Sequence, residues 1–150
     1  TGQPWYPGDE VNLGIGQGDL LITPLQLANA YSAFVARELR TPRLLTSEPN
    51  TKKGEIPLDD AQWSHLMNGL KLVTSARGTA SAAFAFAGYT DFAGKSGTAE
   101  DVGTQQHVLF VAMSPAASPG AVAAVVLDEG QSGSIEAGPI ARDIVLAALR

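Results

Sequence analysis

The sequence of 150 residues predicts an α+β fold in which helices come first, a three-strand antiparallel meander follows, and one helix closes the chain. Capped stretches with helical periodicity occupy the first half. Residues 108–113 and 121–127 are short apolar runs rich in valine, which are typical of strands covered on both faces. Only the short, proline-containing segment 114–120 separates them, so they are expected to pair antiparallel.

Composition excludes several classes of protein. An apolar fraction of 45% and a length of 150 residues fit one globular domain with one core. The net charge is −5 and the 10 basic residues form no cluster, so no nucleic-acid partner is expected. The chain has no cysteine, which removes disulfide frameworks and cysteine-rich metal sites, and we expect no cofactor. No apolar run approaches the roughly 18 residues of a membrane span, so any membrane anchor is expected outside this sequence.

The first helix is predicted to begin after a loop. Residues 1–19 are rich in glycine and proline and have no helical period, which indicates a loop with short extended pieces. Thr23 is then placed as an N-cap, with Pro24 in the first turn and Gln26 completing a capping box. The apolar residues that follow at helical spacing are Leu27, Tyr31, Phe34 and Val35.

A polar excursion and two further helices are predicted next. Residues 40–57 contain three prolines and indicate a surface segment. Asp59 and Gln62 form a second capping box. The apolar residues of this helix that follow the i, i+3, i+4, i+7 spacing are Trp63, Leu66, Met67 and Leu70. Thr79 is placed as the cap of a short helix rich in alanine and phenylalanine that ends at Gly88.

The last third is predicted to hold the sheet and the closing helix. Residues 89–100 form the first strand of the meander, ahead of the two valine-rich strands. Residues 137–149 form the closing helix, with Ile140, Ile144 and Ala148 on one face.

Two glycine-containing segments invite nucleotide-binding hypotheses that fail on spacing. Gly94-Lys95-Ser96 resembles the end of a phosphate-binding loop, but Gly88 lies one position too far upstream and no helix is expected to follow. The segment 14–18 resembles a dinucleotide-binding loop, but Asp19 stands where the third glycine is required. His65 and His107 have no partner at metal-ligand spacing and are interpreted as structural residues.

Lys95-Ser96-Gly97 also matches the third motif of the serine acyltransferases that react with penicillin. The elements predicted around it also fit that motif. The motif lies on a predicted strand that is followed by two apolar strands and a helix. The matching segments are WYPGDEVNLGIGQGDLLITPLQLANAYSAF, RGTASAAF, AGKSGTAE, HVLFVAMSP, AVAAVVL and AGPIARDI, in this order. The chain therefore resembles the C-terminal part of class B penicillin-binding proteins, the peptidoglycan D,D-transpeptidases, most of all the elongation-type penicillin-binding protein 2.

This resemblance implies the C-terminal portion of the penicillin-binding protein and serine β-lactamase-like fold, a five-stranded antiparallel sheet flanked by helices. It implies an enzyme of cell-wall biogenesis and cell shape at the outer, periplasmic face of the cell membrane. A serine of the enzyme would attack the penultimate D-alanine carbonyl of a peptidoglycan stem peptide and release the last D-alanine. The acyl group would then pass to an amine on a neighbouring strand, and β-lactam antibiotics would mimic the acyl donor.

The resemblance also assigns roles to the motif. Lys95 and Thr98 are expected to be catalytic: Lys95 as a positive charge beside the site, and the Thr98 backbone N–H as one of two oxyanion donors. Ser96, Gly97 and Thr98 are expected to bind substrate, because the two hydroxyls would hold its carboxylate and Gly97 would let an extended peptide approach. The peptide would add along the outer edge of this strand. The segment from Gly16 to the Thr23 helix is interpreted as a packing and positioning element.

The departures from the family limit what this chain is expected to do alone. No serine is followed three residues later by lysine, and Ser-x-Asn is also absent, so the nucleophilic serine is not in this chain. Residues 1–150 are therefore expected to need the upstream half of the same domain, as another segment or chain, and to be inactive without it. Two alternatives stay open: a non-catalytic binding or structural module, and a serine β-lactamase relative. Glu100 and Val108-Leu109 are smaller departures.

Overall fold

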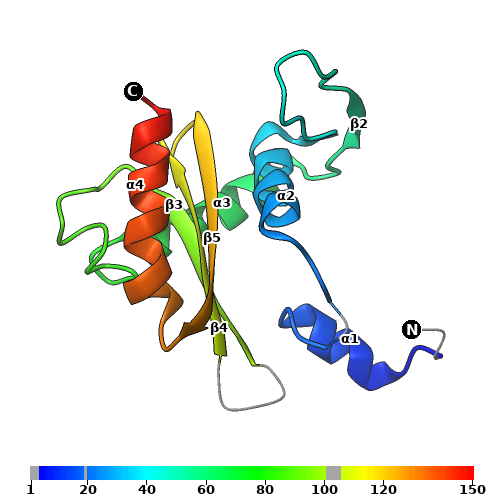
Figure 1. Ribbon diagram of the computed structural model, residues 1–150, viewed down its shortest axis with the longest axis horizontal. Helices are drawn as coiled ribbons and strands as arrows, with labels where there is room; N and C mark the ends of the chain where they lie inside the picture. The colour runs from blue at the N-terminus through cyan, green and yellow to red at the C-terminus, as the bar shows by residue number, and fades with distance from the viewer. Residues whose placement is uncertain (1–3, 19, 101–105) are drawn as a thin grey trace.

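The computed structural model describes residues 4–18, 20–100 and 106–150. A three-stranded antiparallel sheet of order β3-β4-β5 follows the main helices and precedes the C-terminal helix, which confirms the predicted α+β fold (Figure 1). The elements are α1 (Pro7–Gly14), α2 (Pro24–Ala36), β1 (Glu38–Arg40), β2 (Lys52–Glu55), α3 (Asp60–Thr74), β3 (Ala93–Glu100), β4 (Gln106–Ser114), β5 (Ala121–Gly130), the π-helical turn η1 (Gly133–Ala137) and α4 (Gly138–Ala148).

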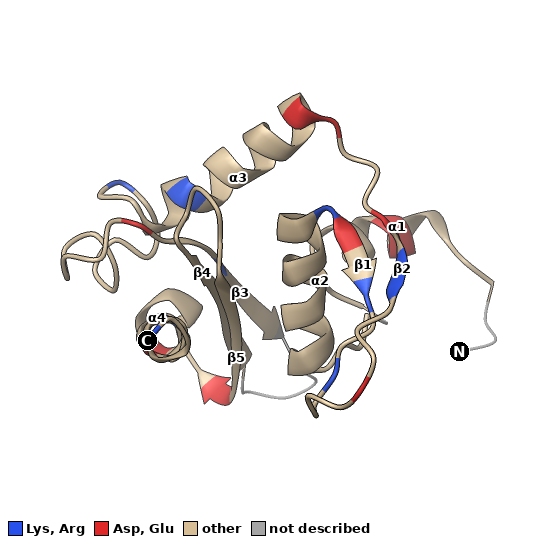
Figure 2. Ribbon diagram, turned by 90° about the horizontal axis from the view of Figure 1, so that it is seen from above, with Lys and Arg blue, Asp and Glu red and all other residues tan. Residues whose placement is uncertain are grey.

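The sheet is covered on both faces, as the valine-rich runs predict. Seen from above, it lies between α4 and α2 (Figure 2). Because strand residues alternate between faces, Phe110 and Ala112 of β4 pack toward α4, whereas Val111 and Met113 pack toward α2 and α3. All four side chains are fully buried. The central strand therefore joins two hydrophobic layers.

Strand β3 lies at the outer edge of this sheet, as expected from the resemblance. It pairs antiparallel with β4 along its whole length, with Lys95 opposite Val111 and Thr98 opposite Val108. In the part of the chain that the structure describes, β3 pairs with β4 alone. One side of β3 is therefore open to a further extended segment.

Both predicted capping boxes are present. The Thr23 hydroxyl accepts a hydrogen bond from the Gln26 backbone N–H at 3.2 Å, and the Gln26 side chain accepts one from the Thr23 N–H at 2.8 Å. Asp59 and Gln62 make the same exchange at the start of α3, at 2.7 and 3.1 Å. Each box satisfies two backbone donors at a helix start, which fixes where α2 and α3 begin.

Helices α2 and α3 are joined through Trp63. Its ring stacks on Phe34 with 6.0 Å between centroids, and its indole N–H donates to the Phe34 carbonyl at 3.1 Å. Arg37, in the left-handed conformation at the end of α2, lies over the Trp63 ring and forms an ion pair with Asp60. Of the four apolar residues at helical spacing, Leu66 is 52% exposed, because the contact of α3 with α2 and the sheet runs through Trp63, Met67 and Leu70.

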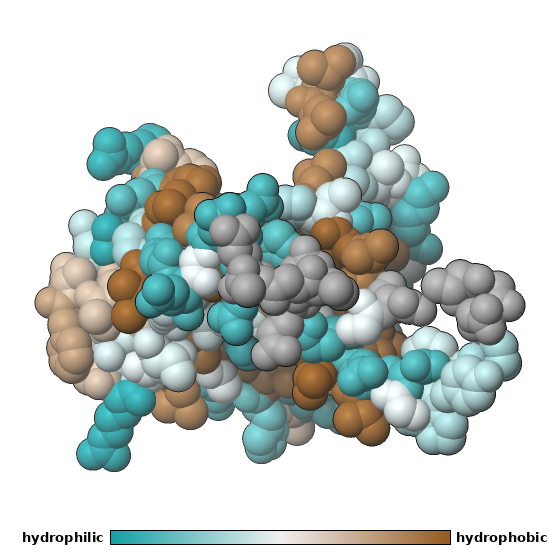
Figure 3. All heavy atoms as spheres, turned by 60° about the horizontal axis from the view of Figure 1, so that its bottom comes forward, coloured by the Kyte–Doolittle hydropathy of each residue, from teal (hydrophilic) through white to brown (hydrophobic). Residues whose placement is uncertain are grey.

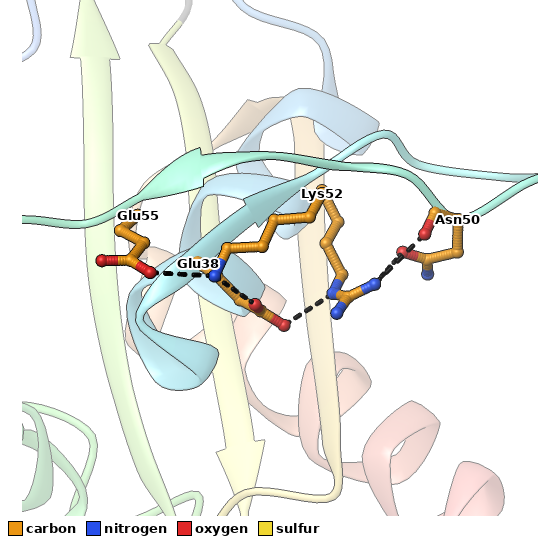
Figure 4. A network of polar contacts seen from close by, with 5 residues as sticks. Glu38, Asn50, Lys52 and Glu55 are labelled. Carbon is orange, nitrogen blue, oxygen red and sulfur yellow. Dashed lines mark hydrogen bonds and ion pairs between the residues drawn. The ribbon is translucent and has the colours of Figure 1, made fainter.

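The predicted surface excursion between α2 and α3 contains a small sheet, β1 paired with β2, that the sequence did not reveal. Figure 4 shows the polar network that supports it. Glu38 accepts a hydrogen bond from Arg40 at 2.6 Å and lies 3.3 Å from Lys52, which also contacts Glu55. Hydrogen bonds from Arg40 and Lys52 hold the pKa of Glu38 below its ordinary value. Arg40 also donates to the carbonyl of Asn50.

The expectation of a loop over residues 1–19 is wrong because α1 forms within it. Pro7 occupies the first turn, where the missing N–H costs nothing, and Asp9 and Glu10 favour the positive end of the helix dipole. The Asp9 carboxylate accepts a hydrogen bond from the Tyr6 N–H at 2.8 Å. No described residue of α1 is buried, so these local contacts account for the helix.

The short helix predicted from Thr79 to Gly88 is also wrong, because the segment forms consecutive turns. Its hydrogen bonds vary in length: Ala83 N–H reaches Ala80, three residues back, and Phe86 N–H reaches Ser81, five residues back. Burial explains the irregular path. Phe84 is fully buried and packs on Phe92 and Phe110, so tertiary packing overrides the regular helix.

The closing helix is confirmed, and the face that it buries is not the one that holds Ile140 and Ile144. Ile140 and Ile144 are 44% and 48% exposed, whereas Gly138, Ala141 and Val145 are buried. Small residues on this face let α4 approach the sheet closely. The Arg142 side chain ties the helix to the preceding turns, donating to the Ala83 carbonyl at 2.6 Å and lying over the Tyr89 ring.

Strand β3 begins at Ala93, four residues later than predicted. The residues just before β3 are held by hydrogen bonds from side chains and not by hydrogen bonds to a neighbouring strand. The Thr74 hydroxyl donates to the Phe92 carbonyl and the Ser114 hydroxyl donates to the Asp91 carbonyl, both at 2.6 Å.

Within the described ranges, no helix is both long and apolar enough to span a bilayer.

Candidate functional site

A groove with a volume of about 570 Å³ runs beside strand β3. Lys95, Ser96, Gly97 and Thr98 all line it, so the structure brings the predicted site residues together in one place. The facing wall consists of Ile15, Gly16, residues 20–24, Leu27 and Tyr31. The remaining lining residues are Ala99, His107, Leu109, Val126 and Asp128.

Two side chains donate hydrogen bonds to carbonyls of β3 on this side. Lys95 Nζ lies 2.7 Å from the carbonyl oxygen of Ser96, and Gln17 Nε2 lies 3.3 Å from the carbonyl oxygen of Thr98. In an antiparallel strand the C=O and N–H of one residue point to the same side. The Thr98 N–H therefore points outward with its carbonyl, as an oxyanion donor requires.

Strand pairing also fixes where the side chains of the motif point. Residues directly opposite each other share a face of the sheet. Ser96 and Thr98 lie opposite Phe110 and Val108 and therefore share one face, as strand alternation predicts. Lys95 lies opposite Val111, on the face that α2 and α3 cover. Lys95 and Thr98 are exposed, while Ser96 is half-buried.

Gly97 has a packing role that sequence reasoning missed. A Cβ added at this position would come within 2.8 Å of Leu109 Cδ1 and 2.9 Å of Leu109 Cγ. The side chain of the opposing residue therefore occupies the space above Gly97. The absence of a side chain here serves the packing of β3 on β4.

The groove is also lined by polar residues that no local pattern indicated. His107 Nδ1 of β4 lies 3.8 Å from Asp128 Oδ1 of β5, and both line the groove. Tyr31 of α2 also lines it, and burial raises the pKa of its phenol above the ordinary value. These residues come from three separate elements, so their proximity depends on the tertiary fold. Among the described residues, no three His, Cys, Asp or Glu side chains gather as a candidate metal site.

Comparison with known proteins places the chain in a family. The penicillin binding protein transpeptidase domain matches residues 1–146. Peptidoglycan D,D-transpeptidase MrdA of Haemophilus influenzae is 32% identical, over 95% of this chain and 26% of that protein. The MrdA of Escherichia coli K12 is 30% identical, over 87% of this chain and 25% of that protein. The chain thus spans about a quarter of the length of the curated relatives it matches.

Solved structures give the same result. The chain aligns with Pseudomonas aeruginosa PBP2, solved in complex with WCK 5153, at a TM-score of 0.75 and 32% identity, over 98% of this chain and 34% of that one. It also aligns with PBP2 of Helicobacter pylori in complex with MreC at a TM-score of 0.78 and 26% identity, over 98% of this chain and 29% of that one. The chain belongs to the penicillin-binding protein transpeptidase domain family and is similar to its PBP2 and MrdA members.

Proposed function

We propose that this chain supplies the substrate-binding strand of a peptidoglycan D,D-transpeptidase that is acylated by β-lactams. One observation carries the proposal: Lys95, Ser96, Gly97 and Thr98 line a single groove at an open sheet edge. An extended peptide can add to such an edge through backbone hydrogen bonds, as strands do in other peptide-binding proteins. The natural acyl donor would be a peptidoglycan stem peptide, and a β-lactam would occupy the same place.

The proposed roles follow from charge and position. The Thr98 N–H would donate to the oxyanion that develops on the attacked carbonyl, since a strand amide is rigidly held. The hydroxyls of Ser96 and Thr98 would bind the carboxylate of the stem peptide or β-lactam. Lys95 would add a positive charge beside that carboxylate. Its short contact with the Ser96 carbonyl supports this assignment, because the contact keeps the ammonium at the open edge.

The nucleophile is proposed to come from the upstream half of the same domain, because no Ser-x-x-Lys occurs among residues 1–150. Two surfaces support the proposal that another segment docks here. In the described residues, β5 pairs with β4 alone, so its other edge is open. Large hydrophobic side chains before α2 are exposed, among them Trp5, Val11 and Leu21, and Figure 3 shows hydrophobic patches on one face of the molecule. We further propose that the complete protein acts on the outer face of the cell membrane.

Labelled penicillin tests the proposed function. The full-length protein that carries this segment is incubated with the label, and the adduct is measured by intact mass. We expect one covalent label per molecule, on a serine outside residues 1–150. The 150-residue chain alone is expected to gain no label. A label on a serine within this chain would contradict the assignment of the nucleophile, and an unlabelled full-length protein would contradict the function itself.

A further inference from the structure

Gln17 is held in place by the end of helix α1. The Gly16 N–H donates to the Leu13 carbonyl at 3.0 Å and the Gln17 N–H donates to the Asn12 carbonyl at 2.8 Å, the pair of bonds of a Schellman motif. Gly16 has a φ of 73°, the left-handed conformation that this motif requires. Gly18 on the other side has a φ of 75°. The backbone of Gln17 is therefore fixed without any help from its side chain.

This arrangement points the Gln17 side chain at the edge of β3, 81 residues away in sequence. Its carboxamide N–H donates to the outward carbonyl of Thr98 at 3.3 Å. A carboxamide N–H is chemically the same donor as a peptide N–H. Gln17 thus makes with β3 the kind of contact that the backbone of an added strand would make.

A ligand that lies along β3 would compete for this contact. An extended peptide or acylamino compound added at the open edge would aim an amide N–H at an outward carbonyl of the strand. The outward carbonyl of Thr98 belongs to the same residue as the N–H that is the proposed oxyanion donor. A carbonyl oxygen has two lone pairs, but both N–H groups would approach from the open side of the strand, where the Gln17 carboxamide already lies. The two donors would therefore compete for the same space beside Thr98.

We propose that Gln17 is a specificity-determining residue that occupies the Thr98 carbonyl until an amide N–H of the acyl donor displaces it. This inference depends on the proposed function, because it assumes that the acyl donor adds along β3. The expected effect of Gln17 therefore differs between two kinds of ligand. Gln17 disfavours ligands that need the Thr98 carbonyl and leaves ligands without an amide N–H unaffected.

The test compares two β-lactams on the full-length protein. Penicillin G has an acylamino side chain with an amide N–H, whereas imipenem has a hydroxyethyl group there and offers none. Gln17→Met keeps the length of the side chain and removes the donor. Since one exposed hydrogen bond is lost, we expect acylation by penicillin G to become about two- to tenfold faster, with imipenem acylation unchanged. The Schellman motif should survive, because only backbone atoms form it.

Gln131→Met is the matched control, since Gln131 is exposed and does not line the groove. Its acylation rates and the thermal melting of both variants should equal those of the wild type. Equal changes with the two drugs, no change, or slower penicillin G acylation in Gln17→Met would overturn the inference and leave the proposed function standing. A wild-type protein that reacts with neither drug would overturn the proposed function and this inference with it.

Discussion

Gly133 lies so close to strand β4 that an added Cβ would come within 2.3 Å of the carbonyl oxygen of Leu109. The same Cβ would lie 2.8 Å from the carbonyl oxygen of Gly97, on the proposed site strand. The turn η1 therefore rests directly on the backbone of β3 and β4. Only glycine permits this approach, so the position of the site strand depends on a residue outside the groove.

Gly133→Ala should destabilise the protein that carries this segment. Backbone atoms at these distances cannot move aside as a flexible side chain would, and overpacking of this kind costs about 1–3 kcal/mol. Chemical denaturation measures the change in the free energy of unfolding. Gly69→Ala is the control, because nothing lies within 4 Å of an added Cβ there and alanine favours the helix interior, so it should stabilise by about 0.5–1 kcal/mol. Equal changes in the free energy of unfolding for Gly133→Ala and Gly69→Ala would show that Gly133 does not lie this close to the backbone of β3 and β4.

Glu136 should make stability depend on pH in the acidic range. Hydrogen bonds from the backbone N–H groups of Gln131 and Ser132, both at 2.7 Å, hold the pKa of Glu136 below its ordinary value. A depressed folded-state pKa stabilises the fold above the unfolded-state value, about 4.3, and this stability is lost as the pH falls through the folded-state pKa. Glu136→Gln should therefore melt at a lower temperature than the wild type at pH about 7, with the gap closing as the pH falls through the folded-state pKa.

Glu129→Gln serves as the control for the pH series, because Glu129 is exposed near the end of β5. Its melting temperature should follow the wild type across the range. If the gap between Glu136→Gln and the wild type stays constant with pH, the carboxylate does not carry the stabilisation.

Thr98→Val should weaken reaction with β-lactams without disturbing the fold. The substitution removes the hydroxyl proposed to bind the drug's carboxylate and keeps the backbone N–H proposed as oxyanion donor. A hydrogen bond to a charged group contributes about 1.5–3 kcal/mol, so acylation of the full-length protein should slow by about tenfold to a hundredfold. Thr46→Val, an exposed threonine in the β1–β2 connection, should react at the wild-type rate. A normal rate for Thr98→Val would remove its hydroxyl from the proposed site.

The sequence predicted those elements whose residue pattern can be recognised within the element itself. Residues 108–113 and 121–127 are valine-rich because both faces of β4 and β5 meet packed side chains, and that requirement is visible locally. The caps at Thr23 and Asp59 were predictable for the same reason, since each box lies within four residues. Helix α1 was missed because none of its described residues is buried, so hydrophobic periodicity gives no signal there.

Features that depend on contacts between residues far apart in the sequence could not be predicted from local patterns. On α4 the periodicity groups Ile140 and Ile144 on one face, but the face that packs closely on the sheet holds the small residues Gly138 and Ala141. The contact of Gln17 with Thr98 joins parts of the chain 81 residues apart. Local pattern identified the motif on β3, whereas the wall that faces it became visible only in the fold.

The most direct test of the account is the rate at which penicillin acylates the full-length protein with Lys95→Ala. Lys95 is exposed at the edge of β3 and adds little packing, so thermal melting should stay unchanged. Loss of one charge-assisted contact of about 1.5–3 kcal/mol predicts acylation slower by about tenfold to a hundredfold. Lys95→Arg should restore little, because a planar guanidinium replaces a compact ammonium, and Lys53→Ala, an exposed lysine of β2, should react normally. Acylation of Lys95→Ala at the wild-type rate would contradict the role proposed for this strand.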